Sequence, residues 1–485
     1  MEYNVDICIV GGSGAGLSAA IRATEAGANV LVLEKMGSTG GCTKMAGGIM
    51  GIGTHLQKEA GLDYSVEEMY KEVMTIYNWD CNSILVRDWY DHIGDNISWL
   101  EELGVEFSEI LEVTGNRGKL RKTHHVTADS ETGKNMWIAL QKRCDELGVP
   151  ILTETRAKHL IVEDGKVTGV KAENAEGEFF VHAKATILAT GSISANDDLI
   201  QRFFGTDKYK KVRIMAKVSH NTGDGLLMAE EIGAQIGKLS TLYIGPHNHF
   251  PGASEAVGVV PRRPYAIKVN RNGKRFVDES LYTDSHSWYQ SISIDRQPGK
   301  TCYAIIDSDI LDMYKQNKVE MGYMERRFNR RDNYPFEWID KLDEGFIHEQ
   351  EAGRAKIAND FDEIAEWIGC DKDTLRNTIE KYNAACDAGH DSRFMKDPYY
   401  LMAIRKPPFY AVAGPSGVDT FIGGVQIDES FHVLNNDDEP IPGLYAAGVV
   451  ASGWLGNFYG NPGSEMSFTL YSGQNAGKIA FAETK

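Results

Sequence analysis

Residues 5–20 read Val5-Asp6-Ile7-Cys8-Ile9-Val10-Gly11-Gly12-Ser13-Gly14-Ala15-Gly16-Leu17-Ser18-Ala19-Ala20, and this stretch decides the fold. A short apolar run rich in β-branched residues leads into a cluster of glycines, and an Ala- and Leu-rich pattern of helical period follows. This order predicts a strand, a tight turn and a helix. Glycines in such a turn let backbone N–H groups approach a pyrophosphate, and the helix N-terminus behind them carries partial positive charge. We therefore expect a dinucleotide-binding site at this turn.

A second strand and an acidic residue complete the unit. Residues 28–33, Ala-Asn-Val-Leu-Val-Leu, predict the second strand of a βαβ unit, and Glu34 follows it. An acidic side chain about twenty residues after the glycines can bind both hydroxyls of a ribose. One position departs from the pattern G-x-G-x-x-G, because Ser13 stands where the middle glycine is expected. Gly14 beside it and the small size of serine keep the turn plausible.

Length and charge limit the possible functions. The chain has 485 residues, which exceeds what one hydrophobic core usually holds, so we expect two domains. Its formal net charge is −18. Nucleic acids and anionic membranes both require a basic surface, so this balance argues against either as a partner. A small-molecule substrate is the remaining expectation.

The cysteines and the chain start predict the compartment. The seven cysteines are scattered and form no C-x-x-C pair. This usage favours a reducing compartment and no structural metal. The chain enters its first strand without a basic region and apolar leader, and no apolar run approaches membrane-spanning length. We expect a cytoplasmic location.

Further patterns place elements along the chain. Residues 37–48, rich in glycine and hydroxyl groups, predict an irregular loop that offers backbone donors to a ligand. Helical spacing recurs over 66–103, where Trp89, Tyr90 and Trp99 fit a core, and again over 133–147. Alternation around Asp164-Gly165 predicts a β-hairpin over 159–172. Strands are predicted at 151–155 and 185–189, and two helices within 360–387.

In order along the chain, these motifs resemble the flavoprotein superfamily of succinate dehydrogenases, fumarate reductases and 3-ketosteroid dehydrogenases. The resemblance rests on the glycine turn, the acid, Gly-Gly-Cys-Thr at 40–43, Ala189-Thr190-Gly191 and Thr222-Gly223-Asp224-Gly225. It continues through residues 270–279, 407–412 and 443–448, and so covers nearly the whole chain. It implies FAD as cofactor and an α/β fold, with a Rossmann-like FAD-binding domain that is split by an inserted α+β substrate-capping domain.

The resemblance also implies domain limits and cofactor contacts. The FAD-binding domain is expected at 1–244 and 411–485, with the cap at 245–410. No covalent-FMN, haem or iron–sulfur segment is present, so electrons are expected to come from, or go to, an external donor or acceptor. The residues expected to contact FAD are Gly11, Ser13, Gly14, Ala15, Gly16, Glu34, Lys35, Gly40, Gly41, Cys42, Thr43, Gly47, Gly48, Ala157, Ala189, Thr190, Gly191, Asn221, Asp224, Gly448, Glu465 and Ser467.

The cationic clamp of fumarate reductases is missing at its expected positions. The proton-donor arginine is expected near Thr283, the histidine before Gly423-Gly424, and the second arginine within 457–461, but none is present. A desolvated dianion without cationic partners is unfavourable by several kcal/mol. The alternative is that Arg262, Arg263 or His247 forms a new clamp.

Neutral hydrogen-bond donors stand in its place. Tyr459 and Gly463 lie four apart, a spacing similar to the ketosteroid dehydrogenase pattern in which a tyrosine and a glycine N–H hold a carbonyl. Such a pair is a neutral oxyanion hole for an enolate. Tyr282, one position before the expected catalytic site, can exchange a proton at the α carbon. The alternative is that both tyrosines are packing residues.

The helix that begins near Ser464 is expected to direct its N-terminus at the flavin. Glu465 in its first turn either binds substrate or caps the helix. We predict an FAD-dependent oxidoreductase acting on a C=C or CH–CH bond beside a carbonyl or phenol, in a flat, weakly charged, steroid-like or isoflavonoid-like substrate. The rival hypotheses are a fumarate reductase-type enzyme for unsaturated carboxylates and a non-catalytic, redox-sensing flavoprotein.

Overall fold

The chain folds into two compact units. The computed structural model describes residues 2–114, 120–205, 214, 219–244, 250, 252–258, 260–282, 287–316, 341–456, 459 and 461–485. Unit 1 comprises Met1–Gly205, Ala216–Leu242 and Thr420–Lys485, and unit 2 comprises Thr206–Met215 and Tyr243–Asp419. Unit 1 is therefore assembled from segments far apart in the sequence.

The main sheet of unit 1 has strand β1 near its centre. Its strand order is β17-β18-β9-β1-β2-β6, and β7 and β8 extend from β9 as an antiparallel meander. β1 pairs in parallel with β2 and with β9, so that Ile7 lies opposite both Val30 and Ala185. Ile7 is fully buried, as expected for a strand covered on both faces. The bounds are β1 Glu2–Val10, β2 Val30–Leu33, β6 Ile151–Leu152, β7 Arg156–Glu163, β8 Lys166–Asn174, β9 Gly177–Leu188, β17 His432–Leu434 and β18 Pro440–Ala446.

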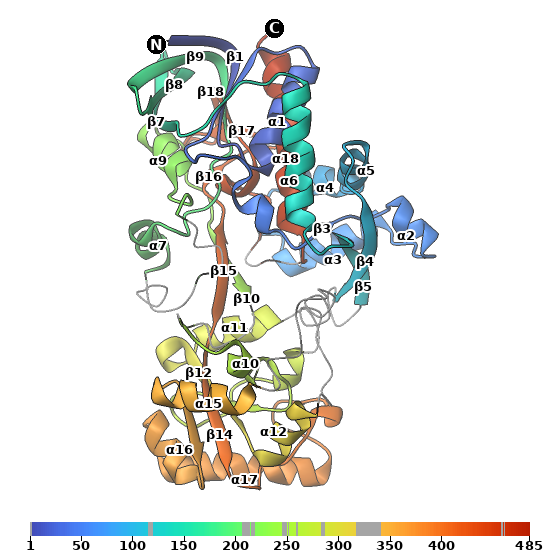
Figure 1. The fold of residues 1–485 in the computed structure, drawn as a ribbon, viewed down its shortest axis with the longest axis vertical. Helices are drawn as coiled ribbons and strands as arrows, with labels where there is room; N and C mark the ends of the chain where they lie inside the picture. Colours follow the sequence, from blue (N-terminus) through green and yellow to red (C-terminus); the bar gives the residue numbers. More distant parts are fainter. Residues whose placement is uncertain are drawn as a thin grey trace. The chain divides into compact units, whose positions relative to one another are not determined.

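Three long helices pack beside this sheet, as Figure 1 shows. They are α1 (Gly14–Glu25), α6 (Thr132–Glu146) and α18 (Ser464–Glu483). Helix α1 packs against both α6 and α18, and α18 also packs against β1, β9 and β18. Gly473 allows the close approach of α1 and α18, because a β-carbon there would lie 2.3 Å from the carbonyl oxygen of Ala15. The last helix of the described chain thus covers the first.

Shorter elements complete unit 1. A small sheet of order β3-β5-β4 and helices α2 to α5 also belong to unit 1; β3 and α5 pack against α18, and β16 pairs with β19. The bounds are β3 Ile49–Met50, β4 Phe107–Thr114, β5 Leu120–Thr127, β16 Val425–Gln426, β19 Ala451–Ser452, η1 Gly41–Met45, η7 Gly448–Val450, α2 His55–Glu59, α3 Val66–Tyr77, α4 Ser83–Asp91, α5 Asp95–Glu102, α7 Asp197–Phe204 and α9 Asp224–Glu231.

Unit 2 is an antiparallel sheet with helices, the α+β composition expected for the inserted segment. Its strand order is β11-β12-β14-β13. A buried core of its own lies between this sheet and the helices. The bounds are β11 Ile267–Val269, β12 Thr301–Ile306, β13 Ala355–Ala358, β14 Phe409–Pro415, α10 Glu255–Gly258, α11 Ser287–Asp295, α12 Ser308–Lys315, α15 Leu342–Glu351, α16 Phe361–Ile368, α17 Lys372–Ala388, η3 Val260–Arg262, η4 Glu279–Tyr282, η5 Pro298–Lys300 and η6 Pro398–Tyr400.

The limits of the units differ from the expected domain limits at the second boundary and at Thr206–Met215, which belong to unit 2. The division falls at 242/243 and 419/420, where the sequence placed boundaries at 244/245 and 410/411. The second limit lies later because β14 pairs with β12 and β13 inside unit 2. The division falls within strands β10 (Ser240–Ile244) and β15 (Gly417–Ile422), which pair with each other.

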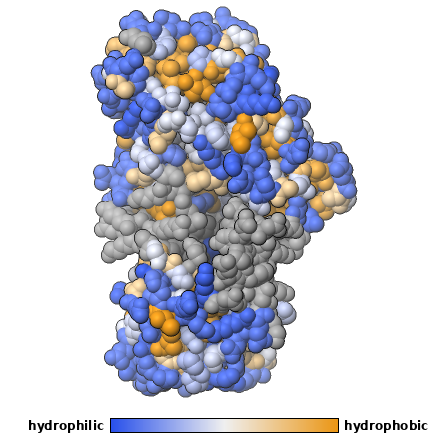
Figure 2. All heavy atoms as spheres, in the orientation of Figure 1, coloured by the Kyte–Doolittle hydropathy of each residue, from blue (hydrophilic) through white to orange (hydrophobic). Residues whose placement is uncertain are grey.

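The drawn face of the described residues is mostly hydrophilic. Figure 2 shows hydrophilic residues over most of the drawn face of each unit, with apolar side chains in small patches. The large exposed apolar side chains include Trp79, Ile84 and Tyr399. Among the residues that the structure describes, no helix is long and apolar enough to cross a membrane.

Candidate functional site

Only glycine fits at position 16, in the first turn of α1, which packs on the turn between β1 and α1. A β-carbon on Gly16 would lie 1.8 Å from the carbonyl oxygen of Gly11. Helix α1 begins at Gly14, and the side chain of its N-cap residue, Ser13, caps none of its N–H groups. The Thr43 hydroxyl accepts the N–H of Gly14, and the helix start still offers further N–H groups and positive potential to an anion. This geometry suits the pyrophosphate expected there.

Glu34 lies at the end of β2, against the same turn. One carboxylate oxygen accepts the N–H of Gly12 at 2.8 Å, and the other accepts the N–H of Met36 at 2.9 Å. The side chain is 8 % exposed, so it is fixed from the protein side. Each carboxylate oxygen has a second lone pair, which remains available to a ribose hydroxyl.

Lys35 and Asp224 are brought together beside Glu34. The Lys35 ammonium donates to Thr222 at 2.6 Å and to Asp224 at 3.0 Å, and Arg156 donates to both oxygens of Asp224. Burial raises the pKa of the Asp224 carboxyl, but the hydrogen bonds from Arg156 and Thr222 and the charge of Lys35 outweigh burial and lower it. Asp224 is therefore charged at neutral pH and holds two cations on this side of the turn.

The Gly-rich loop at 37–48 contains a short helix, where the sequence predicted irregular structure only. Residues Gly41–Met45 form the 3-10 helix η1. Ser13 pairs with Gly40 in a parallel β-bridge, and the buried hydroxyl of Thr43 accepts the N–H of Gly14 at 2.9 Å. These contacts fix the loop against the start of α1, which is why a helical turn forms in a sequence without a helical pattern.

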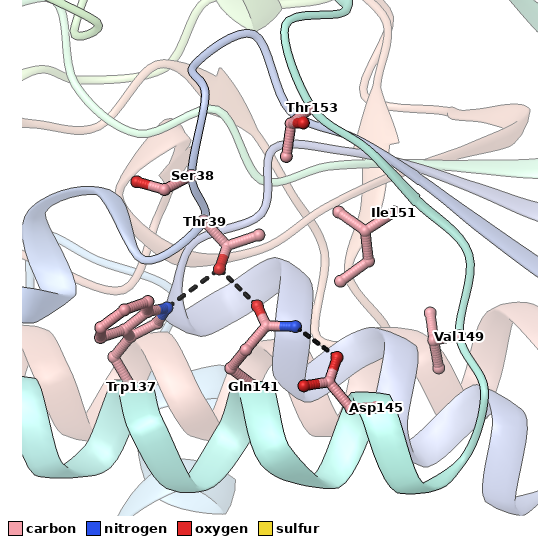
Figure 3. A pocket seen from close by; sticks show the side chains of 8 residues that line it. All are labelled: Ser38, Thr39, Trp137, Gln141, Asp145, Val149, Ile151 and Thr153. Atoms are coloured by element: carbon pink, nitrogen blue, oxygen red, sulfur yellow. Dashed lines mark hydrogen bonds between the residues drawn. The ribbon is translucent and has the colours of Figure 1, made fainter.

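A pocket of about 410 Å³ lies between this loop and α6 (Figure 3). A chain of hydrogen bonds crosses its wall: Trp137 donates to Thr39 at 2.9 Å, Thr39 donates to Gln141 at 2.5 Å, and Gln141 donates to Asp145 at 2.8 Å. The ring of Trp137 also lies under the Lys44 ammonium, 3.8 Å away. The side chains of α6 thus fix the loop at 37–48 through Thr39 and Lys44.

Cys42 and Asn221, both predicted contacts, meet each other. The Asn221 amide donates to the Cys42 sulfur at 3.2 Å and to Ser194 at 3.1 Å. His220 Nε2 lies 3.9 Å from the same sulfur. Burial lowers the pKa of His220, and the charges of Lys35 and Lys44 add to this effect while Glu34 opposes it. A neutral imidazole therefore faces the thiol.

Other predicted contacts line the ends of neighbouring strands. Ala189 follows β9 and donates its N–H to Val10 at 2.8 Å, Gly191 has a positive φ of 74°, and Ala157 is buried in β7. The Thr190 hydroxyl is buried without a hydrogen-bond partner among the described residues. Gly448 donates its N–H to Ser472 at 2.9 Å.

Ser467 has partners that the sequence did not indicate. Its hydroxyl accepts from the indole of Trp89 at 3.1 Å and from Asn96 at 3.4 Å, and its carbonyl accepts from Asn96 at 2.9 Å. These bonds join α18 to α4 and α5. The predicted FAD contact at Ser467 stays a prediction.

Tyr459, Gly463 and Glu465 converge on the start of α18. The Tyr459 hydroxyl accepts the backbone N–H of Glu465 at 3.2 Å, and Tyr459 is 7 % exposed. Gly463 is the N-cap residue of α18 and has a positive φ of 80°. Because glycine has no side chain, the N-cap position makes no side-chain hydrogen bond to the first turn. The Ser464 hydroxyl, also buried, has no partner among the described residues. This helix start offers donors at the place expected to face the flavin.

His124 belongs to this region, although the sequence did not single it out. A β-carbon on Gly463 would lie 2.7 Å from its Nδ1, and one on Gly48 would lie 2.2 Å from its Nε2. The imidazole is therefore wedged between the cofactor loop and the residue expected to hold the substrate oxygen. Met50, in the strand next to that of His124, donates its N–H to the Gly463 carbonyl at 3.1 Å.

Two further tyrosines of unit 1 are buried. Tyr77 ends α3 and Tyr90 lies in α4, both are fully buried, and neither hydroxyl has a hydrogen-bond partner in the described chain. The sequence indicated Tyr90 only as a core residue. Aromatic residues at helical spacing predict burial, but the spacing does not indicate whether a tyrosine hydroxyl has a function.

The predicted acid Tyr282 is the last residue of η4 in unit 2, and its side chain lies outside the described part of the structure. His247 is likewise outside the described residues. Arg263 is fully buried in unit 2.

In the described part of unit 1, every arginine is paired with a carboxylate: Arg22 with Glu25, Arg87 with Asp91, Arg121 with Glu72, Arg143 with Glu25, Arg156 with Asp224 and Arg202 with Glu230.

The residues present fit FAD. The glycine turn and the start of α1 suit its pyrophosphate, and Glu34 suits its ribose. The buried hydroxyls of Thr190 and Ser464, which lack partners among the described residues, are polar atoms that a ligand can satisfy.

Comparisons with known proteins agree with this geometry. A family model described as FAD binding domain matches residues 6–465. Vinyl phenol reductase of Lactiplantibacillus plantarum is 29 % identical over 492 residues, 98 % of this chain and 96 % of that protein. Fumarate reductase (cytochrome) of Shewanella frigidimarina is 28 % identical over 482 residues, 98 % of this chain and 77 % of that protein. The structure of 3-ketosteroid-Δ4-(5α)-dehydrogenase from Rhodococcus jostii RHA1 has a TM-score of 0.74 at 24 % identity, covers 99 % of this chain and 97 % of that one, and shares its fold.

Proposed function

Because the chain belongs to the FAD binding domain family, we propose that it reduces or introduces a carbon–carbon double bond conjugated with a carbonyl or phenol in a flat, weakly charged substrate. Family membership and the relatives confirm three predictions: the superfamily, FAD as the cofactor, and the class, an oxidoreductase acting on C=C or CH–CH bonds. The proposal concerns the substrate and the residues that act on it.

One observation carries the proposal, the position of the Tyr459 hydroxyl at the start of α18. This oxygen accepts the N–H of Glu465 at 3.2 Å, which places the phenol at the helix start, and we propose that the phenol donates to a substrate oxygen there. The Gly463 N–H is the proposed second donor. A buried phenol and a backbone amide form a neutral oxyanion hole, which stabilises negative charge as it develops on a carbonyl or phenol oxygen.

Bound FAD supplies the hydride donor or acceptor of the reaction. In the reductive direction, Tyr459 and Gly463 hold the substrate oxygen and stabilise the enolate or phenolate character that develops there. Tyr282 is the proposed proton donor to the carbon next to the activated bond, and it takes the same proton away in the oxidative direction. Electrons are exchanged with an external donor or acceptor.

Charge supports a neutral substrate. The arginines in the described part of unit 1 are all paired, so none of them is available to hold a carboxylate. Asp419 stands just before Gly423-Gly424, where the resemblance expects a histidine, and burial raises its pKa to about 6. The histidine that the resemblance expects there is thus absent as a cationic partner for a dianion. The relative vinyl phenol reductase, matched over nearly its whole length, carries the name of an uncharged phenolic substrate.

The test is a substrate panel given to photoreduced enzyme. We expect an enone or 4-vinylphenol to restore the absorbance of oxidised flavin, while fumarate does not. Reoxidation by fumarate alone would favour a clamp rebuilt from Arg262, Arg263 or His247, and no reoxidation by any compound would favour a redox-sensing role.

The Tyr459→Phe variant tests the residue assignment. Loss of one oxyanion-hole donor lowers kcat by about 10²–10³-fold. Flavin content is expected to stay unchanged, and Tyr399→Phe, at an exposed tyrosine, is the matched control. Full activity of Tyr459→Phe would refute the proposed mechanism.

A further inference from the structure

The pocket between the loop at 37–48 and α6 is distinct from the predicted sites of FAD and substrate. None of its eight described lining residues is a predicted FAD contact or a proposed catalytic residue. Its volume is about 410 Å³. Figure 3 shows Gln141 and Asp145 extending from α6 toward it, with Val149 and Ile151 beside them. The pocket is therefore available to a second ligand.

The lining of this pocket combines one charged group with an apolar wall. Of the eight described residues that line it, Asp145 alone is charged. Val149, which is only 9 % exposed, and the half-buried Ile151 form the apolar wall. Ligand pockets in general combine apolar surface with a few polar groups that set specificity. A carboxylate beside an apolar wall suits a protonated amine that carries an apolar group.

Asp145 retains acceptor capacity for such a ligand. Gln141 donates to one of its carboxylate oxygens at 2.8 Å. The neighbouring cations on α6, Lys142 and Arg143, both pair with Glu146, so no cation of the described chain neutralises Asp145. A carboxylate has about four acceptor positions, so most of those on Asp145 remain for an ammonium group.

A positive charge marks the opposite end of the pocket. The Lys44 ammonium lies 3.8 Å from the centre of the Trp137 ring and donates to Ser38 at 3.2 Å, and both of these residues line the pocket. Trp137 comes about two turns before Asp145 in α6. Lys44 therefore repels a cation from its own end, and a ligand with one ammonium group is oriented with that group at Asp145.

Thr39 connects the pocket to the glycine turn. Its hydroxyl belongs to the pocket wall, where it accepts from Trp137 at 2.9 Å and donates to Gln141 at 2.5 Å. Its methyl group packs on the turn, because a β-carbon on Gly12 would lie 3.0 Å from it. The next residue, Gly40, donates its N–H to the Gly12 carbonyl at 2.7 Å. A ligand that fixes Thr39 therefore also fixes the turn expected to hold the pyrophosphate.

We propose that this pocket is an effector site for a small primary amine with an apolar body, and that its occupation tightens FAD binding through Thr39. The ammonium group donates to Asp145, and the apolar body covers Val149 and Ile151. Coupling between two binding sites is reciprocal, so FAD tightens amine binding by the same factor. The inference concerns the affinity for the cofactor and goes beyond the chemistry proposed at Tyr459, which its failure would leave unaffected.

Calorimetric titration of the holoprotein with 2-phenylethylamine tests the site, and 2-phenylethanol is the neutral analogue. We expect the amine to bind about three- to fivefold more tightly than the alcohol, the effect of an exposed ion pair. Asp145→Asn should remove this difference, because the asparagine oxygen still accepts the Gln141 N–H but carries no charge. Asp88→Asn, at an exposed position of α4, is the matched control and should bind like the wild type.

A blocking variant tests the pocket by its volume. Thr153 is an exposed residue that lines the pocket, so a large side chain there fills the space without entering the core. We expect Thr153→Trp to abolish binding of both compounds. Equal affinities of the wild type for amine and alcohol, or unchanged amine binding in Thr153→Trp, would overturn the inference.

Titration of apoprotein with FAD, with and without saturating 2-phenylethylamine, measures the coupling by fluorescence. We expect the amine to tighten FAD binding by about fivefold or more. Thr39→Ser should lose most of this gain, because serine keeps the hydroxyl of the pocket wall but lacks the methyl group on Gly12. The Thr39→Ser apoprotein is still expected to bind the amine, which distinguishes lost coupling from lost binding. An FAD affinity of the wild type that does not change with the amine would overturn the inference.

Discussion

Gly463 lies directly against the imidazole of His124, so close that a β-carbon on Gly463 would stand 2.7 Å from Nδ1. The same added carbon would lie 2.7 Å from the backbone nitrogen of Met50. Contacts this short leave no room for any side chain. The residue proposed to hold the substrate oxygen is therefore fixed by its surroundings as well as by its positive φ.

Replacing Gly463 with alanine is expected to reduce turnover severely. The added methyl group must push aside His124 or the backbone at Met50, and the left-handed conformation adds about 1–2 kcal/mol of strain. A 1 Å displacement of a substrate-positioning group costs about a hundredfold in rate. Steady-state kinetics and the flavin absorbance measure the effect. Gly104→Ala is the control, because Gly104 has a positive φ of 94° but open space around it; equal losses in both variants would contradict this account.

Glu34→Gln is expected to weaken FAD binding by roughly ten- to hundredfold, since a hydrogen bond to a charged group contributes about 1.5–3 kcal/mol. The amide oxygen of glutamine can still accept the Gly12 N–H, so the fold should be retained. Titration of apoprotein with FAD, followed by fluorescence, measures the change. Glu173→Gln, at an exposed strand residue paired with Lys158, should bind FAD normally. An unchanged FAD affinity in Glu34→Gln would refute the proposed contact between Glu34 and the ribose.

FAD is expected to protect Cys42 from alkylation. The thiol is half-buried in the cofactor loop and accepts a hydrogen bond from Asn221, so a bound cofactor should cover it. Mass spectrometry after iodoacetamide treatment of apo- and holoprotein gives the labelling rates. Cys370, half-buried in unit 2, should react equally in both forms. Equal labelling of Cys42 with and without FAD would place the cofactor elsewhere.

The stabilising effect of His432 is expected to disappear at alkaline pH. Hydrogen bonds that His432 donates to the carboxylates of Asp428 and Glu483 raise the pKa of His432 to about 9, against an opposing effect of burial. The folded pKa lies above the unfolded value of about 6.5, so the stabilisation is complete below about pH 6.5 and is lost as pH rises through about 9. The Tm difference between wild type and His432→Gln should therefore be large at about pH 6 and small at about pH 10. His159→Gln, at an exposed pair with Glu231, should show little effect, and a difference that grows with pH would contradict the assignment.

The sequence predicted the cofactor domain well because its signals are local. The strand, glycine turn, helix and acid at 5–34 each have a short-range signature, and the structure forms them at Glu2–Val10, Gly14–Glu25 and Val30–Leu33. The hairpin around Asp164-Gly165 and the core positions of Trp89 and Trp99 follow for the same reason.

Contacts between elements far apart in the sequence could not be predicted from such local patterns. The strand Phe409–Pro415 alternates like any half-buried strand, and nothing local indicates that it pairs inside unit 2. His124 and Tyr77 reach Gly463 and Gly456 from other elements, so their proximity depends on tertiary packing. The roles of Tyr459, Gly463 and Tyr282 stay predictions that the variants above test.

The close packing of α18 on α1 sets an order of events during synthesis. Residues 464–483 leave the ribosome long after residues 14–25. Nevertheless, α18 packs directly on the backbone of Ala15 in α1 at Gly473. Before α18 has been synthesised, no helix packs against that side of α1 and the glycine turn. The cofactor is thus expected to be captured only after translation of this last helix, and maturation of the flavoprotein to be a post-translational event.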